Sequence, residues 1–185
     1  RDVVVLEDPH YRGARQVFAA HGARIRGVRV DHEGLVPAAL PNLARLAVVT
    51  PSHQFPTGAL LPLARRVELL EWAAAHQSWL IEDDYDGEFR FGGRPLAALK
   101  SLDHDGRVIY IGSYSKTLFP ALRLGYMVLP ESLREPLHAA RWLEDRGSNT
   151  REQAALAHFM ESGGFERHLR RASQSLRARR AAMLG

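Results

Sequence analysis

The segment from Val108 to Gly125 reads VIYIGSYSKTLFPALRLG. An apolar run ends in a glycine and two serines, Lys116 follows at once, and Arg123 opens a second apolar run. Only two of the 25 basic residues of the chain are lysines. An arginine cannot form a Schiff base because its guanidinium stays protonated, whereas a lysine amine can once it is neutral. The segment therefore indicates that an amine is required at residue 116.

Apolar runs of strand length alternate with helix-like stretches on both sides of this segment. We expect strands at 3–6, 25–30, 46–49, 79–81, 108–111 and 124–129. We expect helices at 11–21, from Pro62 onward with Leu63, Val67, Leu70 and Ala74 on one face, at 133–143, at 150–161 and from Gly164 onward. Gly92 to Pro95 reads as a loop. Because the strands are continuously apolar, they predict a mainly parallel sheet covered on both faces, an α/β three-layer sandwich.

Polar residues gather where four of the predicted strands end. These clusters are Glu7 to Tyr11, Thr50 to Gly58, Glu82 to Asp86 and Ser113 to Lys116. In open α/β sheets, ligands bind beyond the carboxyl ends of the strands. We therefore expect the four clusters to converge on one site.

The residue types in these clusters describe a particular ligand. Two hydroxyls and an arginine can grip a monophosphate through charge-assisted hydrogen bonds. A buried carboxylate can hold a proton on a pyridine nitrogen, a phenol can bond a ring hydroxyl, and an aromatic side chain can stack on a ring. Together with a Schiff-base lysine, these needs describe pyridoxal 5'-phosphate (PLP).

With these motifs the whole chain resembles fold-type I PLP enzymes, and most closely the aminotransferase-like domain of MocR-type regulators in the GntR superfamily. The motifs that carry the resemblance are EDPHY at 7–11, TPSHQFPTG at 50–58, EDDYDGEFR at 82–90 and SYSKTLFPALRLG at 113–125. The last is highly specific. The Gln54-Phe55 form of the second is more similar to the regulators than to ordinary aminotransferases.

The resemblance implies a role for each candidate residue. It implies that Lys116 forms the Schiff base, that Asp83 pairs with the pyridine nitrogen, that Tyr85 bonds the ring hydroxyl, that Tyr11 stacks on the ring, and that Ser113, Ser115 and Arg123 hold the phosphate. One position departs from the pattern. Ordinary aminotransferases place an asparagine before Pro-Thr-Gly to touch the ring hydroxyl, and here that residue is Phe55, with His53 or Gln54 as alternative substitutes.

The resemblance also implies the organisation of the protein. It implies that residues 1–185 correspond to the PLP-binding large domain, as a fragment that lacks the glycine-rich phosphate loop, the small C-terminal domain and the winged-helix domain. We expect a cytoplasmic homodimer that contacts DNA only through the missing domain and binds a small molecule with an amino group. The expected function is an effector domain that senses PLP or an amino compound, and the alternative is a catalytic aminotransferase.

Composition excludes several other classes. The chain has no cysteine, so it has neither disulfides nor thiol chemistry. No apolar stretch approaches the roughly 18 residues that a membrane span needs. Ser115 stands where a phosphate-binding P-loop needs glycine before its lysine, and a metal site at Glu82 to Asp86 has only one acidic cluster to support it.

The formal charge of +4 comes largely from arginines near the C-terminus. They lie at 167–171 and 177–180 and favour a solvated helix face, with Leu169, Leu176 and Met183 pointing inward, over a nucleic-acid site.

Overall fold

The computed structural model describes residues 1–89 and 97–185. The loop predicted at Gly92 to Pro95 and Arg90 of the third motif lie outside these residues. Among the described residues no helix is long and apolar enough to cross a membrane.

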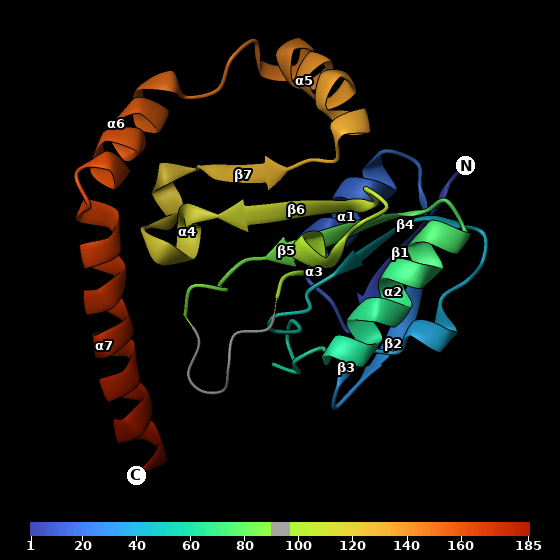
Figure 1. Cartoon of the computed structure of the whole chain (residues 1–185), viewed down its shortest axis with the longest axis horizontal. Helices are drawn as coiled ribbons and strands as arrows, with labels where there is room; N and C mark the ends of the chain where they lie inside the picture. The colour runs from blue at the N-terminus through green and yellow to red at the C-terminus, as the bar shows by residue number, and fades with distance from the viewer. Residues whose placement is uncertain (90–96) are drawn as a thin grey trace. The chain divides into compact units, whose positions relative to one another are not determined.

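Seven strands form one sheet within the described part of the chain, in the order β3-β2-β1-β4-β5-β6-β7 (Figure 1). Their bounds are Val3–Asp8 (β1), Arg24–Asp31 (β2), Gly34–Leu35 (β3), Ala44–Val49 (β4), Trp79–Asp84 (β5), Val108–Ser113 (β6) and Gly125–Val128 (β7). Strands β2, β1, β4, β5 and β6 pair in parallel, and β3 pairs antiparallel with β2. The predicted mainly parallel sheet is confirmed.

The helices follow the predicted order. The longer helices are α1 (Arg12–Ala20), α2 (Leu63–Ala75), α5 (Glu131–Asp145), α6 (Thr150–Glu161) and α7 (Gly164–Leu184). Single turns are η1 (Pro37–Ala39), α3 (Leu99–Leu102), α4 (Tyr114–Thr117) and η2 (Pro120–Leu122). In Figure 1, α2 lies in front of the strands and α1 behind them, so helices cover both faces of the sheet.

The buried face of α2 differs from the predicted one. Leu63 and Val67 are exposed, whereas Arg66, Leu69 and Trp72 are buried. Arg66 sets this orientation, because its guanidinium donates to the carbonyl oxygens of three surrounding segments. The acceptors are Leu61 O at 2.9 Å, Ala97 O at 2.9 Å and Pro51 O at 2.8 Å. A buried arginine is compatible with the core when its N–H groups are hydrogen-bonded. The spacing of apolar residues in the sequence did not predict that Arg66 is buried.

Strand β5 extends further than its apolar run. It continues through Glu82 and Asp83 to Asp84, so these acids are strand residues rather than turn residues. Glu82 is fully buried, and its carboxylate accepts the backbone N–H groups of Leu99 and Lys100, both at 2.9 Å. This use of Glu82 to cap α3 explains how an acid fits inside a buried strand.

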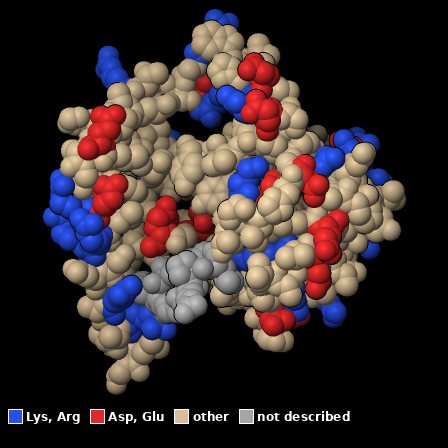
Figure 2. Space-filling model, in the orientation of Figure 1, with Lys and Arg blue, Asp and Glu red and all other residues tan. Residues whose placement is uncertain are grey.

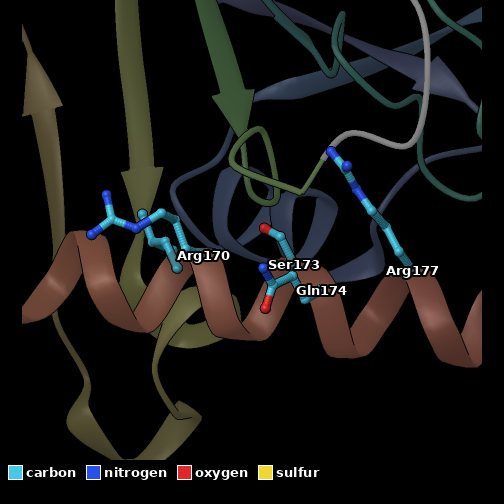
Figure 3. Close-up of a pocket in the computed structure, with 5 residues that line it drawn as sticks. Arg170, Ser173, Gln174 and Arg177 are labelled. Atoms are coloured by element: carbon cyan, nitrogen blue, oxygen red, sulfur yellow. The ribbon is translucent and has the colours of Figure 1, made fainter.

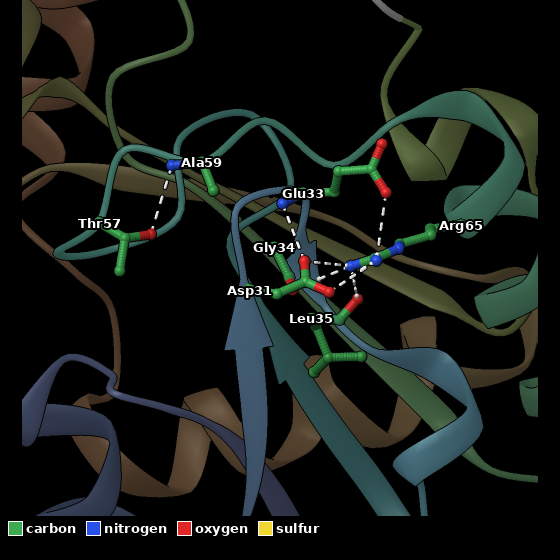
Figure 4. A network of polar contacts seen from close by, with 7 residues as sticks. All are labelled: Asp31, Glu33, Gly34, Leu35, Thr57, Ala59 and Arg65. Carbon is green, nitrogen blue, oxygen red and sulfur yellow. Dashed lines mark hydrogen bonds and ion pairs between the residues drawn. The ribbon is translucent and has the colours of Figure 1, made fainter.

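A salt-bridge network joins α2 to the hairpin of β2 and β3 (Figure 4). Arg65 donates to both carboxylate oxygens of Asp31, at 2.7 and 2.8 Å, and to the carbonyl oxygens of Gly34 and Leu35. These bonds hold the pKa of the Asp31 carboxyl well below its usual value. The network fixes the edge of the sheet, which the sequence did not predict because β3 has only two residues.

The described chain divides into two compact units. The first comprises Arg1–Asp84, Pro95–Gly112 and Tyr126–Arg134, and the second comprises Tyr85–Arg94, Ser113–Gly125 and Glu135–Gly185. In the second unit, arginine side chains gather on the surface of α7 (Figure 2). They are exposed, as a solvated helix face requires. Leu169 and Leu176 are half-buried as expected, but the prediction for Met183 is wrong, because it is 86% exposed.

Candidate functional site

A buried carboxylate lies at the end of β1. Glu7 is 4% exposed, and its Oε2 accepts hydrogen bonds from Thr50 Oγ1 at 2.5 Å and from Gln54 Nε2 at 3.1 Å. Burial raises the pKa of the Glu7 carboxyl above 4.5, against the opposing effect of these bonds, and the negative charge of Asp83 adds to the rise. Glu7 belongs to the first sequence motif, but the sequence did not predict a role for it.

Gln54 connects this carboxylate to the loop that follows β4. Its side chain is 1% exposed, and Nε2 also donates to Pro9 O at 2.8 Å and Phe55 O at 2.7 Å. Its Oε1 accepts from the hydroxyl of Thr57 at 2.7 Å. Because its amide hydrogens are engaged by protein acceptors, Gln54 is a support of the loop. This argues against Gln54 as the group that replaces the asparagine missing at Phe55.

Tyr11 presents its ring at the start of α1. It is 59% exposed and meets the ring of Phe55 edge to face, with centroids 6.1 Å apart and an angle of 85°. The ring lies so close to Gly13 that an added Cβ there would stand 2.7 Å from Tyr11 Cζ. Only glycine at residue 13 allows this placement. The ring that contacts Tyr11 is thus that of Phe55, the residue for which the resemblance to aminotransferases predicts an asparagine.

The acids of β5 have different surroundings. Alternate strand residues point to opposite faces of a sheet, so Asp83 faces away from the side that buries Glu82. Asp83 is half-buried. Asp84 accepts a hydrogen bond from the hydroxyl of Tyr110 at 2.8 Å, and burial together with Asp84 raises the pKa of Tyr110 well above its ordinary value. Asp84 therefore has a structural role, as the acceptor for Tyr110.

The end of β6 carries the lysine segment. Asp84 pairs with Gly112, so β5 and β6 reach their carboxyl ends at the same level. Ser113 caps α4, and its Oγ accepts the backbone N–H of Ser115 at 3.2 Å. Lys116 lies within α4 and is exposed. The second unit thus brings the two serines together and leaves the amine accessible.

Arg123 has an unusual backbone conformation. It follows η2 with φ 55° and ψ 32°, in the left-handed region that side chains other than glycine rarely adopt. Such strain often accompanies a functional side chain. Arg123 is exposed, while Tyr85, directly after β5, is half-buried. Tyr11 and Asp83 belong to the first unit, and the remaining five candidates belong to the second.

The donor set fits PLP in its chemistry. It offers hydroxyls and a guanidinium for a phosphate, an exposed aromatic ring face, a half-buried carboxylate and an accessible amine. Among the residues that the structure describes, no group of three or more His, Cys, Asp or Glu side chains could hold a metal ion.

Two features of α7 were missed by the sequence reading. His168 Nε2 lies 2.7 Å from the carbonyl oxygen of Thr117, the residue after Lys116. Further along α7, Arg170 and Arg177 flank Ser173 at a cavity of about 340 Å³ (Figure 3). No sequence signal distinguished His168 from the charged residues beside it. None of the seven candidate residues is among the described residues that line the cavity.

The mainly parallel sheet with helices on both faces, and the residue types at its strand ends, are those of a fold-type I PLP-dependent protein. The family model for aminotransferase class I and II matches residues 1–184. The chain belongs to this family, whose cofactor is PLP.

Similar proteins fall into two groups. The chain is 42% identical over 96% of its length to the uncharacterized HTH-type transcriptional regulator YdeL of Bacillus subtilis (strain 168) and 41% identical over 92% to the probable rhizopine catabolism regulatory protein MocR of Rhizobium meliloti. It covers 39% and 35% of these relatives. The chain thus spans about two-fifths of the length of these relatives, and the resemblance to MocR-type proteins is confirmed.

The fold is also that of solved aminotransferases. The Pyrococcus horikoshii kynurenine aminotransferase, in complex with PMP, superposes with a TM-score of 0.92 at 31% identity, over 99% of this chain and 48% of that one. The predicted fold class is confirmed by this match.

Proposed function

We propose that residues 1–185 form the PLP-binding large domain of a longer transcriptional regulator, in which PLP or an amino compound is sensed. The observation that carries the proposal is the similarity of nearly the whole chain, at 41–42% identity, to one protein named a transcriptional regulator and one named a regulatory protein. The Gln54-Phe55 motif supports the same assignment, because Phe55 occupies the position of the asparagine that ordinary aminotransferases have.

Each candidate residue has a task in this proposal. Bound PLP supplies an electrophilic carbonyl and an electron-withdrawing ring. Lys116 provides the amine that attaches the carbonyl, and Asp83 holds a proton on the ring nitrogen. Tyr85 donates to the ring hydroxyl, while Tyr11 stacks on the ring. Ser113, Ser115 and Arg123 bind the phosphate.

The local structure supports several of these tasks. The ring of Tyr11 lies against Gly13 and the edge of Phe55 and is 59% exposed, which leaves room for stacking. Asp83 is half-buried, and a partly desolvated carboxylate pairs more strongly with a protonated nitrogen than an exposed one does. Ser113 and Ser115 are separated only by Tyr114, so both lie where β6 passes into α4, just before Lys116.

The test is capture of PLP by the full-length protein. We expect a visible absorbance band when PLP is added, and borohydride reduction followed by peptide mapping should place the adduct on Lys116. Lys116→Ala should abolish both signals. Lys100→Ala is the matched control, because Lys100 is bonded to Asp103 and Val108 and should not react. A reducible adduct that survives in Lys116→Ala contradicts the proposal.

A catalytic aminotransferase is the second candidate, and the match to the kynurenine aminotransferase favours it. In an enzyme, Lys116 would also move a proton as a general base. Rapid conversion of bound PLP to its pyridoxamine form by common amino acids would support turnover. Stable PLP absorbance with the same amino acids, together with altered DNA binding by the full-length protein, would support sensing.

We further propose that the full-length protein is a cytoplasmic homodimer that contacts DNA through a separate winged-helix domain. Relatives named as regulators of the HTH type support the DNA contact. Light scattering of the full-length protein tests the dimer.

A further inference from the structure

Lys116 lies on a helical turn that cannot hold its shape alone. Helix α4 has four residues, and nucleation makes such a short helix unfavourable by itself. Its internal support is the bond from Leu118 N to Tyr114 O at 2.9 Å and the cap by Ser113. The last carbonyl groups of a helix have no partner within it. Contacts from elsewhere must therefore fix the lysine turn.

One of these contacts comes from His168 on α7. Its Nε2 lies 2.7 Å from the carbonyl oxygen of Thr117, and Thr117 is 2% exposed. A carbonyl oxygen only accepts hydrogen bonds, so Nε2 must carry the hydrogen. This bond satisfies the buried carbonyl group next to Lys116 in the chain.

An aromatic contact fixes the other end of the turn. Phe165 stands three residues before His168, so both side chains lie on the same face of α7. Phe165 meets the ring of Tyr114 edge to face, with centroids 6.0 Å apart. Helix α7 therefore contacts the first residue of α4 through Phe165 and the last residue through His168.

The corner between α6 and α7 fixes the start of α7. Phe159 of α6 packs against Phe165 with centroids 6.5 Å apart. A side chain at Gly164 would meet the ring of Phe159, with a Cβ 2.5 Å from its Cδ2. Gly163 caps α7 with φ 67°, a conformation that favours glycine. The two glycines allow this corner to close, and the corner then directs both Phe165 and His168 toward α4.

We propose that His168 is a positioning residue for Lys116, which couples the placement of α7 to the lysine turn through its hydrogen bond to the Thr117 carbonyl. This inference rests on the proposed function, in which Lys116 binds the carbonyl group of PLP. It adds a means of regulation: a shift of α7 that breaks this bond releases the end of α4 and lowers the reactivity of the amine toward PLP.

The experiment compares three variants of the full-length protein with the wild type. His168→Leu removes the donor and keeps an apolar side chain, whereas His168→Gln keeps an N–H donor of similar reach. His158→Leu is the matched control, because His158 is exposed on α6. Two quantities are measured: amide hydrogen exchange of residues 114–118 in the PLP-free protein, and the rate of covalent PLP capture.

We expect His168→Leu to speed exchange at residues 114–118 and to slow PLP capture, each by about fivefold, the effect of one lost hydrogen bond. Exchange in α6 should stay unchanged, which a general loss of stability would not allow. His168→Gln should return both quantities to within about twofold of wild type, since its amide can restore a bond of the same kind. The control should match wild type.

Three results overturn the proposal: wild-type exchange in His168→Leu, equal defects in His168→Gln and His168→Leu, or an equal defect in the control. If His168→Leu does not fold, His168→Asn replaces it, since its amide is too short to reach Thr117. The exchange measurement needs no PLP. A failure of the proposed function, seen as an adduct that persists in Lys116→Ala, is therefore distinguishable from a failure of the role of His168.

Discussion

The side-chain amide of Gln54 lies 3.1 Å from the carboxylate of Glu7, and this bond joins the loop after β4 to the end of β1. Both groups are almost fully buried. The same amide donates to Pro9 and Phe55, so one side chain supports both the loop after β1, which leads to Tyr11, and the loop after β4. The loop after β4 is thus held by a buried polar network.

Replacement of Gln54 should destabilise the protein strongly. Gln54→Leu leaves the acceptors on Glu7, Pro9 and Phe55 without this donor, and we expect the free energy of unfolding to fall by about 3 kcal/mol. Urea unfolding of the full chain measures the change. Gln153→Leu, at an exposed position on α6, is the control and should stay within about 0.5 kcal/mol of wild type. Equal stability of the two variants would show that the network contributes little.

Glu7 should make stability depend on pH. Burial raises its pKa in the folded protein above 4.5, so the folded state holds this proton more tightly than the unfolded chain does. The contribution of Glu7 to the free energy of unfolding is therefore greatest below the unfolded pKa. It declines as pH rises from there to the folded pKa, by about 1.4 kcal/mol for each unit between the two.

Glu7→Gln removes this titration, so the decline with rising pH should be shallower than in the wild type. Urea unfolding of the full chain at a series of pH values measures it. Glu71→Gln, on an exposed position of α2, should leave the slope unchanged. An identical slope in Glu7→Gln and wild type would contradict the assignment.

Because the Tyr11 ring lies against Gly13, a substitution at Gly13 should lower PLP affinity without lowering stability. Gly13→Ala places a methyl group against the Tyr11 ring, and the ring, as the end of a side chain, can swing away. We expect PLP affinity of the full-length protein to fall about tenfold, as the loss of one stacking contact of roughly 1.4 kcal/mol implies. The thermal midpoint should not fall. Tyr11→Phe keeps the ring and should bind PLP as wild type does; a tenfold loss in that variant would point to the hydroxyl instead.

Because Arg123 has a left-handed backbone conformation, its replacement by glycine should raise stability while it weakens PLP binding. Arg123→Gly should raise stability by about 1 kcal/mol because glycine adopts this conformation without strain, yet it should weaken PLP binding because the guanidinium is lost. Arg146 provides a matched control, since it is exposed and has φ 52°. Arg146→Gly should raise the thermal midpoint in the same way and leave PLP binding unchanged. If both variants bind PLP equally well, Arg123 does not hold the phosphate.

The elements of this fold could be predicted because their signals are local. The continuous apolar run at Val108 and the helix start after Pro62 depend on neighbouring residues alone. The orientation of α2 could not be predicted, because it depends on carbonyl groups from distant segments that satisfy Arg66. The hydrogen bonds of Arg66 therefore orient α2 differently from the orientation that the spacing of its apolar residues predicted.

The candidate site was predictable in part for the same reason. Lys116 and its serines form a contiguous motif, so the sequence indicates them directly. The partners that hold this motif come from far along the chain: His168 reaches Thr117 across 51 positions and stands among arginines that face solvent. A histidine in such a run carries no local sign of its contact, and only the folded backbone identifies it.

The place of β1 between β2 and β4 in the sheet has a consequence for biosynthesis. Its two neighbours, β2 and β4, leave the ribosome after it, and β5 and β6 can be added only once β4 is in place. The parallel sheet therefore grows from the middle toward the edge in the order of translation, through crossovers that bring distant segments together slowly. Because β6 joins last among the parallel strands and α7 follows it, the proposed PLP site around Lys116 should form only after the parallel sheet has been assembled.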